Sequence, residues 1–132
     1  MTQWLAGMRI TADRLNDHSE YDDTTTTGLV AATGFTVSAF SGKKRSGITY
    51  VDVFVTRTGG DMTSSGGNIT DTQMCVLPVN WQPGEVINGQ WGQGLADGEC
   101  TINPDGTIVL RSANGTIGNN TNLRVTSSWP TP

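Results

Sequence analysis

Apolar and polar residues alternate with a period of two along most of the chain after residue 28. Residues 35–39 alternate apolar with small polar side chains, and residues 48–56 form the longest run of this kind. In the longer run Val51, Val53 and Val55 fall on one face, because successive side chains of an extended strand point to opposite sides. This period predicts β-strands, of which 48–56 is the strongest.

The opposite face of the 48–56 strand is also apolar, since it carries Ile48, Tyr50 and Phe54. A two-layer β-sandwich covers only the inner face of each sheet, so the outer face of this strand needs another cover. We therefore predict an oligomer interface at Ile48, Tyr50 and Phe54. The alternative is that these are isolated outward-facing side chains, of a kind that many monomers carry.

Further short strands follow at regular spacing, with turn residues between them. The clearest hairpin has strands at 99–102 and 107–110, joined by a Pro-Asp-Gly sequence that favours a tight turn. Seven or eight such strands without a helical period predict an all-β fold. Its most favoured form is an antiparallel β-sandwich of jelly-roll type, with a barrel as the alternative. The other segments with a strand pattern are 74–77, 86–91 and 123–129.

The first 27 residues have a different pattern and are predicted to be an attachment segment and linker, ahead of a β-sandwich domain at 28–132. A helical turn capped by Thr11 is favoured at 12–16, but so short a helix is marginal unless it packs on a partner. Residues 17–27 are polar and aperiodic, which is typical of a linker. The side chains predicted to dock on a neighbouring protein are Trp4, Leu5, Met8, Ile10 and Leu15.

The apolar content limits the core that one copy of the chain can build. Leu, Ile, Val and Phe together make 27 of the 132 residues, which is near the level at which chains fail to fold alone. Only 15% of the residues are charged and four are tryptophan, so disorder is not favoured. The composition therefore favours a domain that completes its core by self-association.

Charge and hydropathy argue against several classes of partner. The formal net charge of -4 gives no electrostatic reason to expect a nucleic acid or an anionic membrane. The one basic cluster, Lys43–Arg45, is predicted to lie in a hairpin loop. No run of 18 apolar residues occurs, and the opening lacks the pattern of a secretory signal. We expect a protein without membrane insertion that stays in a cytoplasm or is assembled there into a larger particle.

No pattern typical of catalysis, cofactor binding or metal binding occurs in the sequence. The single histidine, His18, lies in the polar linker, and no nucleophile elbow, dinucleotide motif or zinc-protease motif is present. Cys75 and Cys100 lie in strand-like runs and are predicted to be buried free thiols, with a disulfide as the alternative. The chain is therefore not expected to be an enzyme. The remaining catalytic option is a glycosidase-like pair of carboxylates from Glu85, Asp97 and Glu99.

Two tryptophans are the best candidates for ligand binding. Trp81 and Trp91 are flanked by glutamines, asparagines and glycines, and flat apolar rings beside amide groups suit sugar recognition. This pattern makes a glycan a candidate ligand. The alternative is that both rings pack at a loop base or at a subunit interface.

Several motifs carry a resemblance to phage proteins. The opening at 6–16, Ala-Gly-Met-Arg-Ile-Thr-Ala-Asp-Arg-Leu-Asn, resembles a segment near the start of minor structural proteins of phages, particularly phages of actinobacteria. Leu77-Pro78, Trp81-x-Pro83, the strand at 105–110 and the final Trp129-Pro130 resemble the trimeric β-sandwich heads of phage tail fibres and baseplate receptor-binding proteins. Together these motifs cover most of the chain.

The resemblance implies a homotrimeric virion protein that is assembled in the cytoplasm of the bacterial host. Its N-terminal segment would dock on other virion structural proteins, and its β domain would face outward. Such heads usually follow a stalk, whereas here only the short linker precedes the domain, so a capping, decorating or tail-tip role also fits the sequence. A tail- or fibre-associated structural protein is the leading hypothesis. A carbohydrate-binding module for host-surface glycans is the alternative.

Overall fold

The computed structural model describes residues 6–7 and 22–132, and these form nine β-strands and no helix. All neighbouring strands run antiparallel, which confirms the predicted all-β antiparallel fold. The predicted docking side chains Trp4, Leu5, Met8, Ile10 and Leu15 lie outside the described residues. The strands are β1 (Asp23–Thr25), β2 (Val30–Ala31), β3 (Phe35–Arg45), β4 (Ile48–Arg57), β5 (Asn68–Val76), β6 (Ile87–Gly92), β7 (Asp97–Ile102), β8 (Thr107–Ser112) and β9 (Asn122–Pro130).

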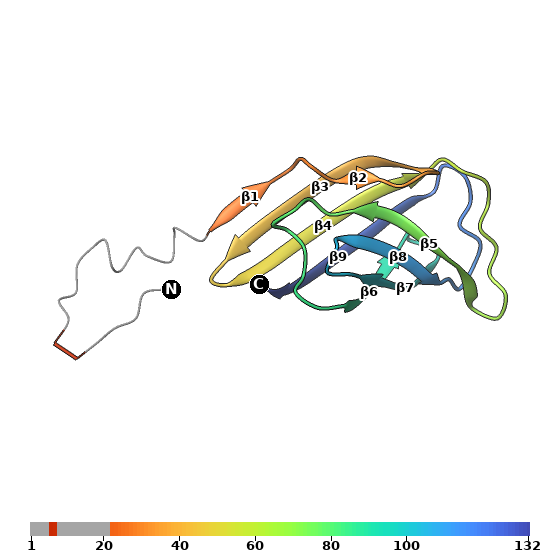
Figure 1. Ribbon diagram of the computed structural model, residues 1–132. Helices are drawn as coiled ribbons and strands as arrows, with labels where there is room; N and C mark the ends of the chain where they lie inside the picture. The colour runs from red at the N-terminus through yellow and green to blue at the C-terminus, as the bar shows by residue number, and fades with distance from the viewer. Residues whose placement is uncertain (1–5, 8–21) are drawn as a thin grey trace.

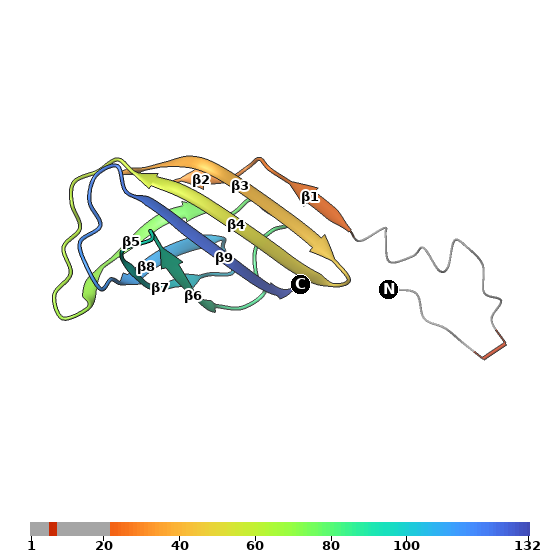
Figure 2. The same ribbon diagram turned by 180° about the vertical axis from the view of Figure 1, so that it is seen from behind.

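The nine strands of the described chain belong to one sheet, in the order β1-β3-β4-β9-β6-β7-β8-β5-β2. Figures 1 and 2 show the sheet curling until its two halves face each other across a shared core. We call β1, β3, β4 and β9 the β4 wall, and β2, β5, β6, β7 and β8 the β7 wall. In the β7 wall β5 lies beside β8 of the β6-β7-β8 meander, which is a Greek-key order of the kind that jelly rolls contain.

The core lies between the two walls and is built from the inward-facing residues of each alternating strand. Val51, Val53 and Val55 of β4 are buried, as the period of two predicts. They belong to the same apolar cluster as Leu110 of β8 and Trp91 of β6, so the cluster joins both walls. Burial of a side chain such as Leu110 stabilises the fold by roughly 2 kcal/mol, and this cluster is therefore the main support of the curled sheet.

A two-residue turn joins β3 to β4 and sets their register. Ser46 and Gly47 have φ angles of 51° and 79°, the left-handed values that such a hairpin turn requires. The turn pairs Arg45 with Ile48. The basic cluster Lys43–Arg45, predicted to lie in a loop, instead ends strand β3, because β1 pairs with it on the other side.

The predicted hairpin between β7 and β8 is confirmed. Its turn is held by the Asp105 carboxylate, which accepts hydrogen bonds from the Thr107 backbone N–H at 3.0 Å and from the Thr107 hydroxyl at 2.7 Å. These hydrogen bonds favour the charged carboxylate and lower the pKa of Asp105. The Pro-Asp-Gly sequence therefore forms the turn through its side chain as well as its backbone.

The sheet begins earlier than the predicted domain boundary at residue 28. Asp23 pairs with Lys44 and Thr25 pairs with Gly42, so β1 is an edge strand of the β4 wall and not part of a linker. Threonine is β-branched and fits a strand whenever a neighbouring edge offers hydrogen bonds. The β domain of the described chain therefore includes β1.

The strands connect at two ends of the curled sheet. The terminal end holds the β3–β4 turn, the loop 77–86, the β7–β8 turn and residues 130–132, with the C-terminus beside the β3–β4 turn (Figure 1). The far end holds the connections at 32–34, 58–67, 93–96 and 113–121. Side chains at these two ends and on the outer faces of the walls are the ones that another molecule can reach.

Candidate functional site

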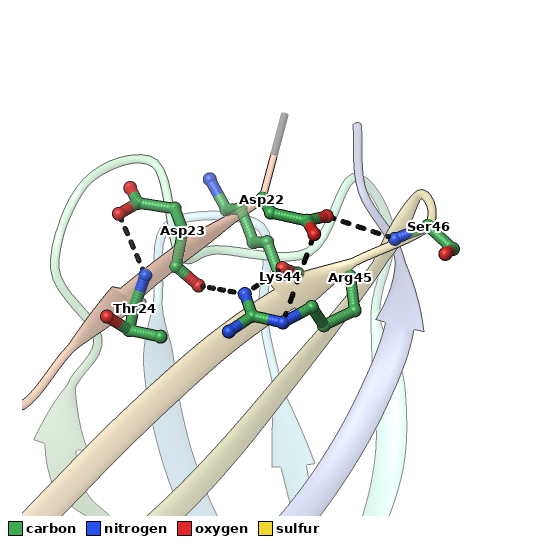
Figure 3. A network of polar contacts seen from close by, with 6 residues as sticks. All are labelled: Asp22, Asp23, Thr24, Lys44, Arg45 and Ser46. Atoms are coloured by element: carbon green, nitrogen blue, oxygen red, sulfur yellow. Dashed lines mark hydrogen bonds and ion pairs between the residues drawn. The ribbon is translucent and has the colours of Figure 1, made fainter. Parts of the chain in front are cut away.

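A network of polar contacts fixes the place where the N-terminal segment joins the β domain (Figure 3). The Asp22 carboxylate lies 4.0 Å from Arg45 Nε and accepts the Ser46 backbone N–H at 3.4 Å. Arg45 Nη1 in turn donates to the carbonyl oxygens of Asp23 and Lys44, at 3.2 and 2.7 Å. We call these contacts the anchor network. Its groups are exposed, so it contributes little stability, but it links Asp22 and the start of β1 to the β3–β4 turn.

The C-terminal residues are held at the same β3–β4 turn. The Thr131 backbone N–H donates to the Gly47 carbonyl oxygen at 2.8 Å. The hydroxyl groups of Thr131 and Thr49 also lie 2.8 Å apart, and Thr49 is buried. Both ends of the β domain therefore meet at one turn, while the far end holds neither.

Trp81 closes the core at the terminal end. Its ring packs so tightly on β3 that a Cβ atom added to Gly42 would lie 2.7 Å from ring carbon Cε3. The ammonium group of Lys44 lies 4.7 Å from the ring centroid on the outer side. The backbone N–H of Trp81 donates to the Pro78 carbonyl oxygen at 3.0 Å, which makes the loop 77–86 a compact turn. Trp81 therefore packs at a loop base.

Trp91 lies deeper, in the middle of the core, with 1% of its surface exposed. Its indole N–H donates to the Ser112 carbonyl oxygen of β8 at 2.9 Å. With Trp81 also buried, neither ring has an open face on which a sugar can stack. The glycan site predicted at Trp81 and Trp91 is therefore not formed in this structure, because the Trp91 ring belongs to the core cluster and the Trp81 ring is covered where it packs on β3.

The outer face of β4 carries the side chains predicted to form an oligomer interface. Tyr50 is 48% exposed, whereas Ile48 and Phe54 are half-buried. The guanidinium carbon of Arg124 lies 4.8 Å from the centroid of the Phe54 ring, so the chain itself covers part of this face. The apolar area left open is consequently centred on Tyr50.

The outer face of strand β7 is polar by comparison. Its outward positions on β7 are Asp97, Glu99 and Thr101, and Arg111 of β8 pairs with Asp71 at 2.8 Å. This difference makes the β4 wall the better candidate for contact with another protein.

Of the candidate catalytic carboxylates, Asp97 and Glu99 share the outward face of β7, whereas Glu85 lies apart from both. Glu85 lies in the loop 77–86 at the terminal end, whereas Asp97 begins β7 at the far end. Glu85 lines a cleft of about 170 Å³ that contains neither Asp97 nor Glu99. Within residues 6–7 and 22–132, no three side chains of metal-binding type come together. None of the described residues forms a helix that is long and apolar enough to cross a membrane.

Cys75 and Cys100 are free thiols buried in the core, as predicted. They lie on β5 and β7 with β8 between them, so two interstrand spacings of about 4.8 Å separate their backbones, more than a disulfide spans. Burial raises the pKa of each thiol to about 12. A smaller contribution comes from Cys100 to the pKa of Cys75 and from Glu99 to that of Cys100.

We expect neither cysteine to react with a thiol reagent such as DTNB in the native protein at mildly alkaline pH. A pKa of about 12 leaves almost no thiolate, which is the reactive form, and the core shields both sulfur atoms. Adding guanidinium chloride should expose both thiols to DTNB in step with unfolding. The absorbance of the coloured product measures the reaction. Rapid reaction of either thiol without denaturant would contradict the packing of β5 and β7.

Comparison with models of known protein families and with curated proteins finds no match to this chain. The phage resemblance of the opening segment and of the loop motifs therefore stays a prediction. The structure does place Leu77, Pro78, Trp81 and Pro83 in one loop at the terminal end. The anchor network at that end is not predictable from sequence patterns, since Asp22 and Arg45 are distant in the chain and occur in polar segments.

Proposed function

We propose that the chain is a structural component of a phage virion, associated with the tail or its fibres. The segment before β1 holds a neighbouring virion protein, and the β domain faces outward. This polarity is supported by the anchor network, which ties the start of β1 to the β3–β4 turn, where residues 130–132 are also held. The N-terminal segment leaves the β domain at the terminal end, so a partner held close to Asp22 would face that end and the far end would point away from it. The viral part of the proposal is supported by the resemblance of residues 6–16.

We infer further that copies of the chain associate through the outer face of the β4 wall. Support comes from exposed Tyr50 and its half-buried neighbours Ile48 and Phe54, which contrast with the polar outer face of strand β7. The low apolar content of the chain favours the same conclusion. The physical argument supports self-association, and the number of three copies comes from the resemblance.

Deleting residues 2–16 is expected to leave a folded oligomer that no longer enters particles. The deletion spares every strand of the β domain but removes the side chains proposed to dock. The test is complementation of a phage that lacks the gene, with the wild-type or the truncated chain, followed by immunoblotting of purified particles. We expect a loss of about tenfold or more, which corresponds to at least about 1.4 kcal/mol of docking free energy.

Circular dichroism and sedimentation of the truncated chain provide the control for folding and association. A truncated chain that enters particles as well as the wild type would contradict the docking role of residues 2–16. A wild-type chain that is absent from purified particles would contradict the virion assignment itself.

A further inference from the structure

The terminal end has the features of a rigid docking face that is separate from the N-terminal segment. All five prolines of the chain lie there, although the sequence spreads them over its last 55 residues. Three of them line an open cleft of about 450 Å³. A fourth lines the smaller cleft beside Glu85, and the fifth packs over Gly28. In chain order these prolines are Pro78, Pro83, Pro104, Pro130 and Pro132.

Proline is confined to one end of the described sheet. The connections at the far end contain none, although both ends use residues with positive φ, such as Asn120 at 64° there and Asn80 at 76° in the loop 77–86. The proline ring fixes φ, so a loop that contains proline has less freedom to lose when a partner binds. The prolines therefore make the loop 77–86 more preorganised than a loop of the same length without them.

The loop 77–86 presents apolar side chains on this rigid base. Val79 is 74% exposed and Val86 is 56% exposed. Trp81 and Pro83, which lie between them in the sequence, are buried and fix the loop, so the valines cannot turn inward without unpacking Trp81. Val79 and Val86 therefore present apolar surface at the end of the domain where the proline-lined clefts open.

Two polar groups at the terminal end make no hydrogen bond or ion pair within the described chain. The indole N–H of Trp129, a residue that lines the smaller cleft, is buried and has no hydrogen-bond acceptor among residues 22–132. Leaving such a donor unpaired costs about 1–3 kcal/mol, and an acceptor from another molecule would recover this only by displacing the side chains that cover the indole nitrogen. Lys44 lines the larger cleft together with Asp23, and its ammonium group lies over the Trp81 ring but forms no ion pair with any described carboxylate.

We propose that the terminal end is a second docking surface for the same virion protein that the N-terminal segment holds. That partner presents an apolar surface to Val79 and Val86, a hydrogen-bond acceptor to Trp129 and a carboxylate to Lys44. This proposal rests on the proposed function and specifies its docking geometry.

The point at which the N-terminal segment joins the domain is the reason for choosing this occupant. Residues 1–21 join the domain at Asp22, within the anchor network of the terminal end. Even fully extended, 21 residues span at most about 75 Å, so a protein that they hold stays within that distance of the clefts. Tethering at this range gives an effective concentration on the order of millimolar, at which even a weak surface contact forms.

A double substitution, Val79→Asp with Val86→Asp, tests the proposal in the full chain. Both side chains are exposed, so we expect the fold to be retained and incorporation into particles to fall about tenfold or more with the N-terminal segment intact. Leu95→Asp is the matched control, because Leu95 is 98% exposed but lies at the far end. The control should enter particles at the wild-type level. A double variant that does the same would overturn the proposal.

A photo-cross-linker placed at position 79 distinguishes the possible occupants in assembled particles. We expect a product that joins this chain to a different virion protein, identified by mass spectrometry. A product that joins two copies of this chain would assign the terminal end to self-association and overturn the proposal. If the wild-type chain itself is absent from particles, the proposed function fails and the docking surface fails with it. If the wild-type chain enters particles and the double variant enters them equally well, the docking surface fails but the proposed function stands.

Discussion

Replacing Gly98 with alanine is expected to lower the free energy of unfolding by roughly 3 kcal/mol or more, or to prevent folding altogether. A Cβ atom at Gly98 would overlap the carbonyl oxygen of Ser112 and would lie 2.8 Å from Nε1 of Trp91. These two groups form the hydrogen bond that orients Trp91 in the core. The oxygen belongs to the backbone of β8 and the ring is buried, so neither group can move aside cheaply.

Urea unfolding followed by tryptophan fluorescence measures this effect, and Gly92→Ala is the matched control. Gly92 lies at the end of β6, where an added Cβ would meet no atom within 4 Å. We expect the control to change the free energy of unfolding by less than about 1 kcal/mol. Equal midpoints and slopes for Gly98→Ala and the wild type would contradict the pairing of β7 with its neighbours around Trp91.

The long strands of the β domain are predictable because the alternation of apolar and polar residues that indicates each strand lies within a single segment. The alternation in 48–56 places Val51, Val53 and Val55 on the inner face, and β4 has that arrangement. The β7–β8 hairpin follows equally from the local sequence, since its turn residues bond to each other. In these segments the local pattern and the packing agree.

Strands β1 and β2 are not predictable from their own residues. They contain three and two residues, too few for a period, and they exist because β3 and β5 offer edges to pair with. The order of strands in the sheet is likewise not predictable from local patterns, because strands that pair come from distant parts of the chain. The misplaced domain boundary at residue 28 is a direct consequence.

The candidate sites show the same division between local and distant information. Trp91 occurs beside polar residues in the sequence, which suggests a binding surface. It lies an even number of residues from Ile87 on β6, however, so both side chains point to the same face of the strand, and that face packs in the core. No single proline in the sequence indicates that the five lie close together at the terminal end. Only the curled sheet brings them together, because the loop 77–86, the β7–β8 turn and the end of β9 meet at one end.

Replacing Tyr50 with glutamate is expected to convert the proposed homotrimer into monomers without unfolding the β domain. The side chain is 48% exposed and contributes little to the core, and the new carboxylate would lie across from Lys43 of β3, where it is tolerated in a monomer. In an oligomer the same charge would be buried against the apolar face of a second copy. A central interface tyrosine typically contributes 2 kcal/mol or more, so the dissociation constant should rise about 30-fold or more.

Sedimentation equilibrium across micromolar concentrations measures this change against the mass of 14.0 kDa for one chain. The wild type should sediment as three chains and Tyr50→Glu as one. Val30→Glu is the control, because Val30 is 62% exposed but lies on β2 in the other wall, and this variant should remain trimeric. A wild-type mass of one chain would refute self-association. A trimer that survives Tyr50→Glu would place the contact somewhere other than the β4 wall, because burying a charge at the centre of an interface is costly even beside Lys43.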